Sequence, residues 1–156
     1  FDYSAENARI IAEEMRAFRP DVVLTHHGPD SQSMDHDTCW RLATRAVQLA
    51  GTIGLESAYK PIHRPEVFLF EATVPLTELE GFNPDLYVDI TDTMEIKVQA
   101  LRALNRAQAP LEGWYIGVAG QRAFQAQRLT GNNAIKYAEA FERTAPWVGA
   151  ALPVDR

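Results

Sequence analysis

The sequence contains a single cysteine, Cys39, among its 156 residues. One thiol excludes an internal disulfide framework and is typical of a chain that works in a reducing cytoplasm. No run of apolar residues approaches the length of about 20 that a membrane-spanning helix needs. Lysine and arginine form no block and the formal net charge is −6, so nucleic acid is not expected as a partner. A small anionic substrate is compatible with this balance, because one local arginine or metal ion can bind it.

Histidine is also scarce, with four in the chain, yet three of the four fall within the stretch 26–36. An apolar run, 22–24, leads directly into this stretch. Its candidate ligands are His26, His27, Asp30, Asp35 and His36. Imidazole and carboxylate are ligands that zinc and similar divalent ions prefer. Because open α/β sheets place their sites beyond the carboxyl ends of strands, the stretch predicts part of a metal centre.

The predicted metal centre is incomplete. A catalytic zinc site usually needs three protein ligands and one open position, and this chain offers His36 as one strong candidate beside weaker ones. The sequence lacks an initiator methionine and enters a helical pattern soon after Phe1. We therefore expect an N-terminal truncation that removes the other ligands, and we expect this chain alone to be inactive.

Hydrophobic periodicity predicts that strands alternate with helices. The expected strands cover residues 21–25, 66–72 and 86–90, the first two of them buried. The expected helices cover residues 4–18, 35–50, 92–107, 114–128 and 132–143, with Ser4 and either Asp35 or Asp37 as N-caps and capping-box spacing from Asp92 to Glu95. The pattern predicts an α/β fold with a mostly parallel sheet. We expect one domain over 1–156, with a helical tail from about residue 131 to 156.

The side chains of the histidine stretch also have ordinary structural interpretations. His26 and His27 alternate in direction along an extended strand, so only one of them is expected to face the site. Asp30 fits a turn and Ser33 is common in turns. Asp35 fits a helix N-cap.

Three more candidates have two interpretations each. His36 begins a helix, where it either ligates a metal, with a carboxylate orienting its second nitrogen, or only makes a hydrogen bond. Glu71 lies near the carboxyl end of the second expected strand, where it either faces the site or is solvated. Arg122 either pairs bidentately with a substrate carboxylate or lies on a solvated helix face.

Two segments resemble the PIG-L/LmbE superfamily of zinc-dependent enzymes. They are RPDVVLTH at 19–26, followed by Asp35 and His36, and VDITDTMEIKVQAL at 88–101. In that family the strand leads into a loop that ends in His-Pro-Asp-His, and the last histidine, a metal ligand, corresponds to His36. The resemblance implies a Rossmann-like three-layer sandwich. It also implies two more ligands and a carboxylate base on an N-terminal strand and Ala-His-Pro-Asp-Asp-Glu motif, which have no counterpart here.

Departures from the family pattern favour one branch. The deacetylases of the family carry a histidine where this chain has Ser33, and that histidine is expected to stabilise the oxyanion of amide hydrolysis. The segments PEVFLFE at 65–71 and FNPD at 82–85 resemble the 4-oxalomesaconate hydratase branch. So does the later part of the chain, through Tyr115, 121–122 and 138–140. Residues 105–108 also differ from the His-x-Ser-Gln that deacetylases often carry.

This resemblance implies a zinc-dependent hydratase that adds water to an unsaturated oxo-polycarboxylate of the 4-oxalomesaconate type in aromatic-acid catabolism. The expected site consists of the metal ligand His36, the catalytic residues Asp35 and His26, and the substrate-binding residues Asp30, Ser33, Glu71 and Arg122. Two alternatives stay open: a zinc-dependent N-deacetylase of N-acetylglucosamine-type conjugates, and an inactive fragment or binding module. The expected partner is a small anionic substrate in the cytoplasm, without nucleic acid or membrane, and a homo-oligomer is compatible with the resemblance.

Overall fold

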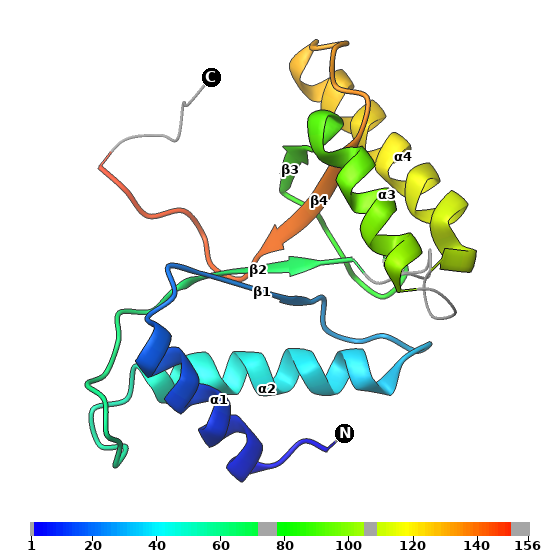
Figure 1. The fold of residues 1–156 in the computed structure, drawn as a ribbon. Helices are drawn as coiled ribbons and strands as arrows, with labels where there is room; N and C mark the ends of the chain where they lie inside the picture. The colour runs from blue at the N-terminus through cyan, green and yellow to red at the C-terminus, as the bar shows by residue number, and fades with distance from the viewer. Residues whose placement is uncertain (1, 72–77, 105–108, 151–156) are drawn as a thin grey trace. The chain divides into compact units, whose positions relative to one another are not determined.

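The computed structural model describes residues 2–71, 78–104 and 109–150 (Figure 1). The chain forms two compact units. The first consists of residues 1–83 and 142–156, and the second of residues 84–141. None of the described helices is long and apolar enough to cross a bilayer.

The first unit opens with helix α1, Ala5–Phe18, and strand β1, Val22–His26. As expected, Ser4 caps α1, and its side chain accepts a hydrogen bond from the backbone N–H of Asn7 at 3.0 Å. Arg19 ends the helix in the left-handed region at φ 56° and donates its N–H to Met15 O. This sharp reversal leaves only three residues between the end of α1 and the start of β1.

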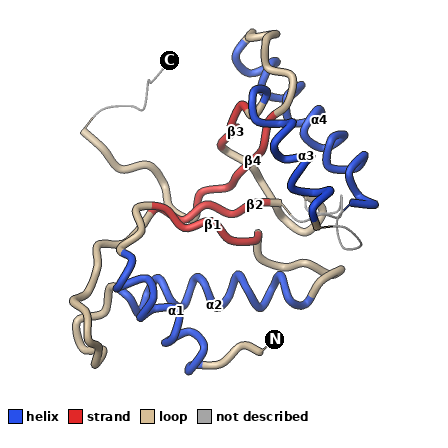
Figure 2. The backbone as a smooth tube through the Cα atoms, viewed as in Figure 1, coloured by secondary structure: helices blue, strands red, loops and turns tan. Residues whose placement is uncertain are grey.

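Helix α2, Met34–Ala50, and strand β2, Glu66–Phe70, complete the regular part of this unit. The N-cap of α2 is Ser33 rather than either expected aspartate. Strand β2 lies parallel to β1, with Val22 opposite Glu66 and His26 opposite Phe70. Figure 2 shows α1 and α2 on one side of this strand pair. The expected strand covered residues 66–72, but β2 ends at residue 70. Residue 72 lies outside the described part of the chain.

The core of the first unit is divided between two groups of apolar side chains. Between the helices pack Ala12, Ala46, Ala50 and Ile62. Between α2 and the strands pack Val47, Val67 and Leu69, joined by Val23. The expectation of a buried strand over 21–25 is wrong in part, because Val22 and Leu24 are 51% and 57% exposed. Strand β1 is an edge strand of the sheet, and its alternate residues face away from α2.

Arg16 is a charged side chain in this core, with only 1% of its surface exposed. Its guanidinium donates hydrogen bonds of 2.5 to 3.4 Å to backbone carbonyls at the end of α2 and in the loop that follows. The acceptors are Leu49, Ala50, Thr52, Leu55 and Tyr59. The last carbonyls of a helix lack intrahelical partners and carry the negative end of its dipole, so a buried cation suits this position. Arg16 therefore fixes the C-terminal end of α2 to α1.

The second unit begins with strand β3, Leu86–Asp89, the 3-10 turn η1, Thr91–Thr93, and helix α3, Met94–Ala103. A second 3-10 turn, η2, Ala109–Leu111, precedes helix α4, Glu112–Thr130. The capping box expected at Asp92 does not form, because α3 starts after η1 with Thr93 as its N-cap and without a side-chain cap bond. Residues 105–107 of the helix expected over 92–107 lie outside the described residues.

Thr91, the first residue of η1, connects two segments of the second unit. Its hydroxyl donates to Asp89 Oδ1 at 2.6 Å and accepts hydrogen bonds from the backbone N–H groups of Lys136 and Tyr137. These contacts join the end of β3 to the segment that leads into β4, Ala138–Arg143. The Asp-Ile-Thr part of the second family-like segment therefore has a structural role.

The helix expected over 132–143 is wrong. Residues 138–143 form β4, which pairs antiparallel with β3 from Asp89–Ala138 to Leu86–Phe141. Alanine and glutamate favour helices in isolation, but here Ala138 and Ala140 are buried at 1% and 2% exposure in the unit's core. Packing in the sheet outweighs a propensity difference of a few tenths of a kcal/mol per residue.

The sheet is mixed rather than mostly parallel. The four strands follow the order β1-β2-β4-β3, with β1 and β2 parallel and β3 and β4 antiparallel. The expected α/β class is confirmed, and the expected mostly parallel sheet is not. Because β4 contributes residues to both units, a single domain over 1–156 stays a prediction.

Candidate functional site

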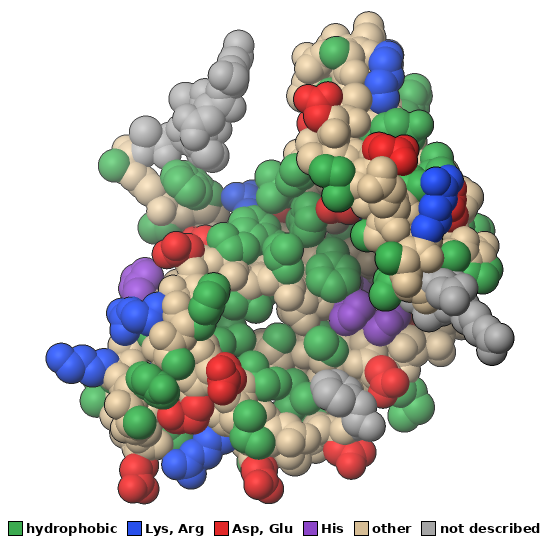
Figure 3. All heavy atoms as spheres, in the orientation of Figure 1, with side chains coloured by type: hydrophobic (Ala, Val, Ile, Leu, Met, Phe, Trp, Pro, Cys, Tyr) green, Lys and Arg blue, Asp and Glu red, His purple; other side chains and the backbone are tan. Residues whose placement is uncertain are grey.

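The candidate site forms where β1 ends and α2 begins, in the first unit. Strand β1 ends at His26, and the backbone N–H of His27 continues the ladder to Phe70 O at 2.8 Å. Ser33 is extended at φ −149° and caps α2, which starts at Met34, so His36 lies in the first turn of that helix. Figure 3 shows histidine side chains at the surface of the molecule beside hydrophobic ones. The geometry matches the expected polar site at a strand end.

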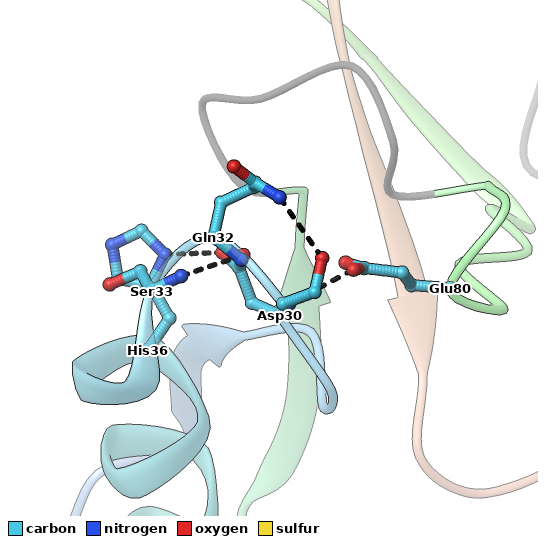
Figure 4. A network of polar contacts seen from close by, with 6 residues as sticks. Asp30, Gln32, Ser33, His36 and Glu80 are labelled. Carbon is cyan, nitrogen blue, oxygen red and sulfur yellow. Dashed lines mark hydrogen bonds and ion pairs between the residues drawn. The ribbon is translucent and has the colours of Figure 1, made fainter.

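Asp30 is the carboxylate that organises the loop. It is only 8% exposed. Its Oδ1 accepts hydrogen bonds from the backbone N–H groups of Gln32 and Ser33, at 2.8 and 3.1 Å, and its Oδ2 lies 2.7 Å from His36 Nδ1. Figure 4 shows Asp30 between His36 and Glu80 in this network. The residue expected to bind substrate therefore has both of its oxygens engaged by the protein.

The surroundings of Asp30 favour its charged form. Burial is the largest single effect and raises the pKa of the carboxyl, but it is outweighed. The hydrogen bond from His36, the backbone donors Gln32 and Ser33, and the charge of His36 together bring the pKa of Asp30 below its ordinary value. Hydrogen bonds to a carboxylate stabilise its ionised form. Asp30 is therefore a carboxylate near neutral pH.

His26 lies flat against His36. The two ring centroids are 4.0 Å apart and the planes differ by 12°, while the ring of Phe70 touches His26 from another side at 4.6 Å. Burial, followed by the neighbouring His36, lowers the pKa of His26, and Asp30 opposes this shift. The Nδ1 atom of His26 is buried and makes no hydrogen bond within the part of the chain that the structure describes. A neutral ring with an unused nitrogen beside His36 is a candidate for contact with substrate.

His27 has different neighbours, as alternation along a strand predicts. It is 8% exposed and its ring meets Phe82 edge-on at 5.4 Å. Its Nδ1 lies 3.4 Å from a carboxylate oxygen of Glu142, and its Nε2 lies 3.5 Å from the carbonyl of Glu80. The 3.4 Å approach is within ion-pair distance, but Nδ1 makes no hydrogen bond to any residue that the structure describes. His27 packs the loop and is not placed beside His36.

Glu80 is a site-supporting residue that sequence reasoning missed. Its Oε1 accepts a hydrogen bond from the backbone N–H of Ser31 at 2.9 Å. The two residues are 49 positions apart in the chain, and no local pattern in the sequence connects them. Glu80 therefore anchors the histidine loop from a distant segment.

The other predicted site residues have separate positions. Asp35 is exposed in the first turn of α2, and Ser33 is half-buried at its N-cap. Glu71 is half-buried and directly follows β2. Arg122 belongs to the second unit, where it is buried in α4 and donates to Gln125 Oε1 at 3.0 Å. Contact of any of these four with substrate stays a prediction.

The described residues fit one corner of a metal site. His36 uses Nδ1 toward Asp30, which leaves Nε2 as the nitrogen able to bind a metal. A metal-ligating histidine commonly directs its other nitrogen to a carboxylate in this way. No group of three or more potential ligands occurs among residues 2–71, 78–104 and 109–150. The donor set thus suits a single zinc ligand, with the remaining ligands expected elsewhere.

Comparison with known proteins places these observations in context. The chain is 32% identical over 141 residues to a protein of Pseudomonas putida KT2440 named 4-oxalmesaconate hydratase, covering 88% of this chain and 54% of that protein. The structure of the present chain is similar to that of GalB, the 4-carboxy-2-hydroxymuconate hydratase from Pseudomonas putida KT2440. The TM-score is 0.86, with 30% identity over 97% of this chain and 63% of that one. No family model matches the chain.

More distant structures share the fold. An N,N'-diacetylchitobiose deacetylase from Pyrococcus horikoshii matches with a TM-score of 0.64 and 22% identity, over 91% of this chain and 52% of that one. A conserved protein from Thermus thermophilus matches with a TM-score of 0.74 and 23% identity, over 99% of this chain and 64% of that one. The chain therefore spans between half and two thirds of the length of each of the proteins named here.

Proposed function

We propose that the chain is a member of the PIG-L/LmbE superfamily and forms part of a zinc-dependent hydratase of aromatic-acid catabolism, a proposal that its similarity to hydratases of Pseudomonas putida supports. The proposed substrate is an unsaturated oxo-polycarboxylate of the 4-oxalomesaconate type. The observation that carries the proposal is the His36–Asp30 pair at the end of β1, 2.7 Å apart. The hydratase names in both comparisons with Pseudomonas putida KT2440 support the reaction class.

In this proposal His36 binds the metal, and the side chains near it are candidates for proton transfer. His36 Nε2 would hold zinc, which when bound supplies a positive charge that polarises an oxygen of substrate or water. His26 presents a neutral ring whose buried Nδ1 has no hydrogen-bond partner among the described residues, so it is suited to hold or accept a proton. Asp35 offers an exposed carboxylate in the same turn as His36.

Water addition requires one proton to leave the water and one to reach the carbon of the double bond. A positioned base and acid on opposite sides of these steps lower the barrier, typically by a factor of about 10²–10⁴ in rate. His26 and Asp35 are our candidates for these transfers. A polycarboxylate also needs cations for binding, and the expected role of Arg122, which is buried in the second unit, stays a prediction.

Deacetylation is the less supported reaction. Its oxyanion would lack the histidine that the deacetylases carry where this chain has Ser33, and one lost oxyanion donor costs about 3–4 kcal/mol of transition-state stabilisation. Similarity to the Pyrococcus horikoshii deacetylase, at 22% identity, supports the shared fold and not the reaction.

The proposal is tested on the full-length protein that contains this chain. We expect about one zinc ion per chain by elemental analysis, hydration of 4-oxalomesaconate, and no release of acetate from an N-acetyl amino sugar. His36→Ala should lose the zinc, while Arg45→Ala, an exposed change on the same helix, should keep it. Unchanged zinc content in His36→Ala would remove His36 from the site, and acetate release without hydration would overturn the reaction class.

A further inference from the structure

Asp30 is not part of the four-residue family motif that ends at His36. It precedes that histidine by six residues, and its side chain is 4% exposed, while that of His36 is 27% exposed. A buried carboxylate that meets a half-buried imidazole at 2.7 Å is close enough for a strong, charge-assisted hydrogen bond. The contact joins the middle of the loop to the first turn of α2.

We propose that Asp30 is the positioning residue of this site, and that it holds His36 in the tautomer that carries its proton on Nδ1 and its free lone pair on Nε2. The inference rests on the proposed function only in assigning zinc to that Nε2. The choice of tautomer follows from the contacts of Asp30 alone.

The hydrogen bonds of Asp30 determine which ring nitrogen of His36 carries the proton. A carboxylate accepts hydrogen bonds and cannot donate them. Oδ1 already receives the backbone N–H groups of Gln32 and Ser33, which fixes the orientation of the carboxylate and directs Oδ2 at His36. The ring atom that faces Oδ2 is Nδ1, so Nδ1 must carry the proton. In a neutral imidazole the other nitrogen then has the lone pair, which is the form that binds metals.

A second contact fixes the plane of the His36 ring. The hydrogen bond to Asp30 alone would allow rotation about the line between the two side chains. The ring of His26, stacked at 4.0 Å and nearly parallel, blocks that rotation on one side. Asp30 and His26 together therefore set the direction in which His36 Nε2 points. Catalytic and metal sites depend on such supporting contacts, since they hold ligands within about 0.5 Å of the productive geometry.

The same contacts show what an amide at position 30 would do. An asparagine keeps one oxygen, which can still accept from Gln32 and Ser33, so the turn is retained. Its NH₂ group would face His36 Nδ1 as a donor, and Nδ1 would then have to accept. The proton would move to Nε2 and block the metal-binding position. Asp30→Asn therefore reverses the tautomer while changing the shape of the side chain very little.

The test compares Asp30→Asn with Asp37→Asn. Asp37 lies one residue after His36, pairs with Arg41 at 2.9 Å, and gives the same change of charge without touching the loop. The first readout is the His36 tautomer in this chain without metal, from the ring nitrogen chemical shifts in long-range ¹H–¹⁵N NMR spectra. We expect Nδ1–H in the wild type and in Asp37→Asn, and mainly Nε2–H in Asp30→Asn.

The second readout is zinc affinity of the full-length protein, measured by competition with a chromophoric chelator. Loss of a supporting partner typically weakens metal binding by about 10–100-fold, so we expect that loss in Asp30→Asn and none in Asp37→Asn. An Nε2–H tautomer in the wild type, or Nδ1–H retained in Asp30→Asn, would overturn the inference. If Asp30→Asn fails to fold, the wild-type spectrum alone decides. Absence of zinc binding beside the expected tautomers would refute the proposed function and leave the role of Asp30 standing.

Discussion

Replacing Arg16 is expected to give the largest loss of stability of any single change described here. Methionine at this position keeps a long unbranched side chain in the core and removes all five hydrogen bonds to carbonyls. A hydrogen bond to a charged group contributes about 1.5–3 kcal/mol net. The whole side chain is buried, so solvent does not replace the lost donors.

Several features reduce the sum of these contributions. The carbonyls of Leu49 and Ala50 also accept backbone N–H groups, from Thr52 and Ile62. Two of the five bonds, to Leu55 and Tyr59, are long at 3.3 and 3.4 Å. Removal of the charge also removes the cost of keeping it buried. We therefore expect Arg16→Met to lose about 3 kcal/mol of unfolding free energy, a large share of the roughly 5–15 kcal/mol typical of a folded protein.

Urea unfolding of this chain measures the effect. With a slope of about 1–3 kcal/mol/M, a loss of about 3 kcal/mol lowers the midpoint by at least about 1 M. Arg9→Met is the matched control, because Arg9 lies on the same helix, is exposed and makes a single bond to Glu56 O. Arg9→Met should change stability by less than about 0.5 kcal/mol. A loss below about 1 kcal/mol in Arg16→Met would refute the argument that these bonds fix the end of α2.

Two further predictions concern the second unit. Gly131 ends α4 at φ 73°, whereas Gly117 lies inside that helix with open space where a Cβ would be. Alanine should therefore destabilise the protein by about 1 kcal/mol at position 131 and stabilise it by about 0.5–1 kcal/mol at position 117. If thermal unfolding shows that both substitutions change the stability in the same direction, the prediction is wrong. Thr91→Val removes a hydroxyl with three partners and should cost about 1–2 kcal/mol at neutral pH, whereas Thr91→Ser should cost little. The hydrogen bonds from Thr91 lower the pKa of Asp89 below its ordinary value of 3.8, so the folded state favours the carboxylate. That contribution is fully present above about pH 4 and disappears as the pH falls through the folded pKa. The difference in unfolding free energy between wild type and Thr91→Val should therefore become smaller in acid. A difference that becomes larger in acid would contradict this prediction.

Local signals in the sequence were sufficient for part of the fold. Ser4 and the reversal near Arg19 define α1, and the apolar run before His26 predicts a strand that ends at the polar loop. These features depend on neighbours in the chain, which a sequence shows directly. Residues 138–143 were misassigned because their partner strand, β3, is about 50 residues away and decides between helix and strand.

The sequence located the histidine loop at the end of a strand, but it did not predict the contacts within that loop. His36 and the loop before it were found from composition and spacing, and the structure places His26 against His36. A carboxylate was expected to orient the second nitrogen of His36, and both Asp30 and Asp35 lie near it in the sequence; the loop folds back so that Asp30 makes the contact. Sequence spacing alone does not choose between these two, since the choice depends on which carboxylate the backbone N–H groups of the turn stabilise. The anchor from Glu80 is a long-range contact of the same kind.

The C-terminal end of helix α2 is bonded to the guanidinium of Arg16, and His36 lies in the first turn at its other end. Its 17 residues make a rod of about 25 Å at about 1.5 Å per residue. Tilting such a rod by only about 2° around its anchored end displaces the opposite end by nearly 1 Å, an error that can reduce a reaction rate about 100-fold. The accuracy with which His36 is aimed is thus set in part by a cation far from any chemistry. In the proposed hydratase, substitutions remote from the histidines would then reduce turnover without altering any group proposed to meet the substrate.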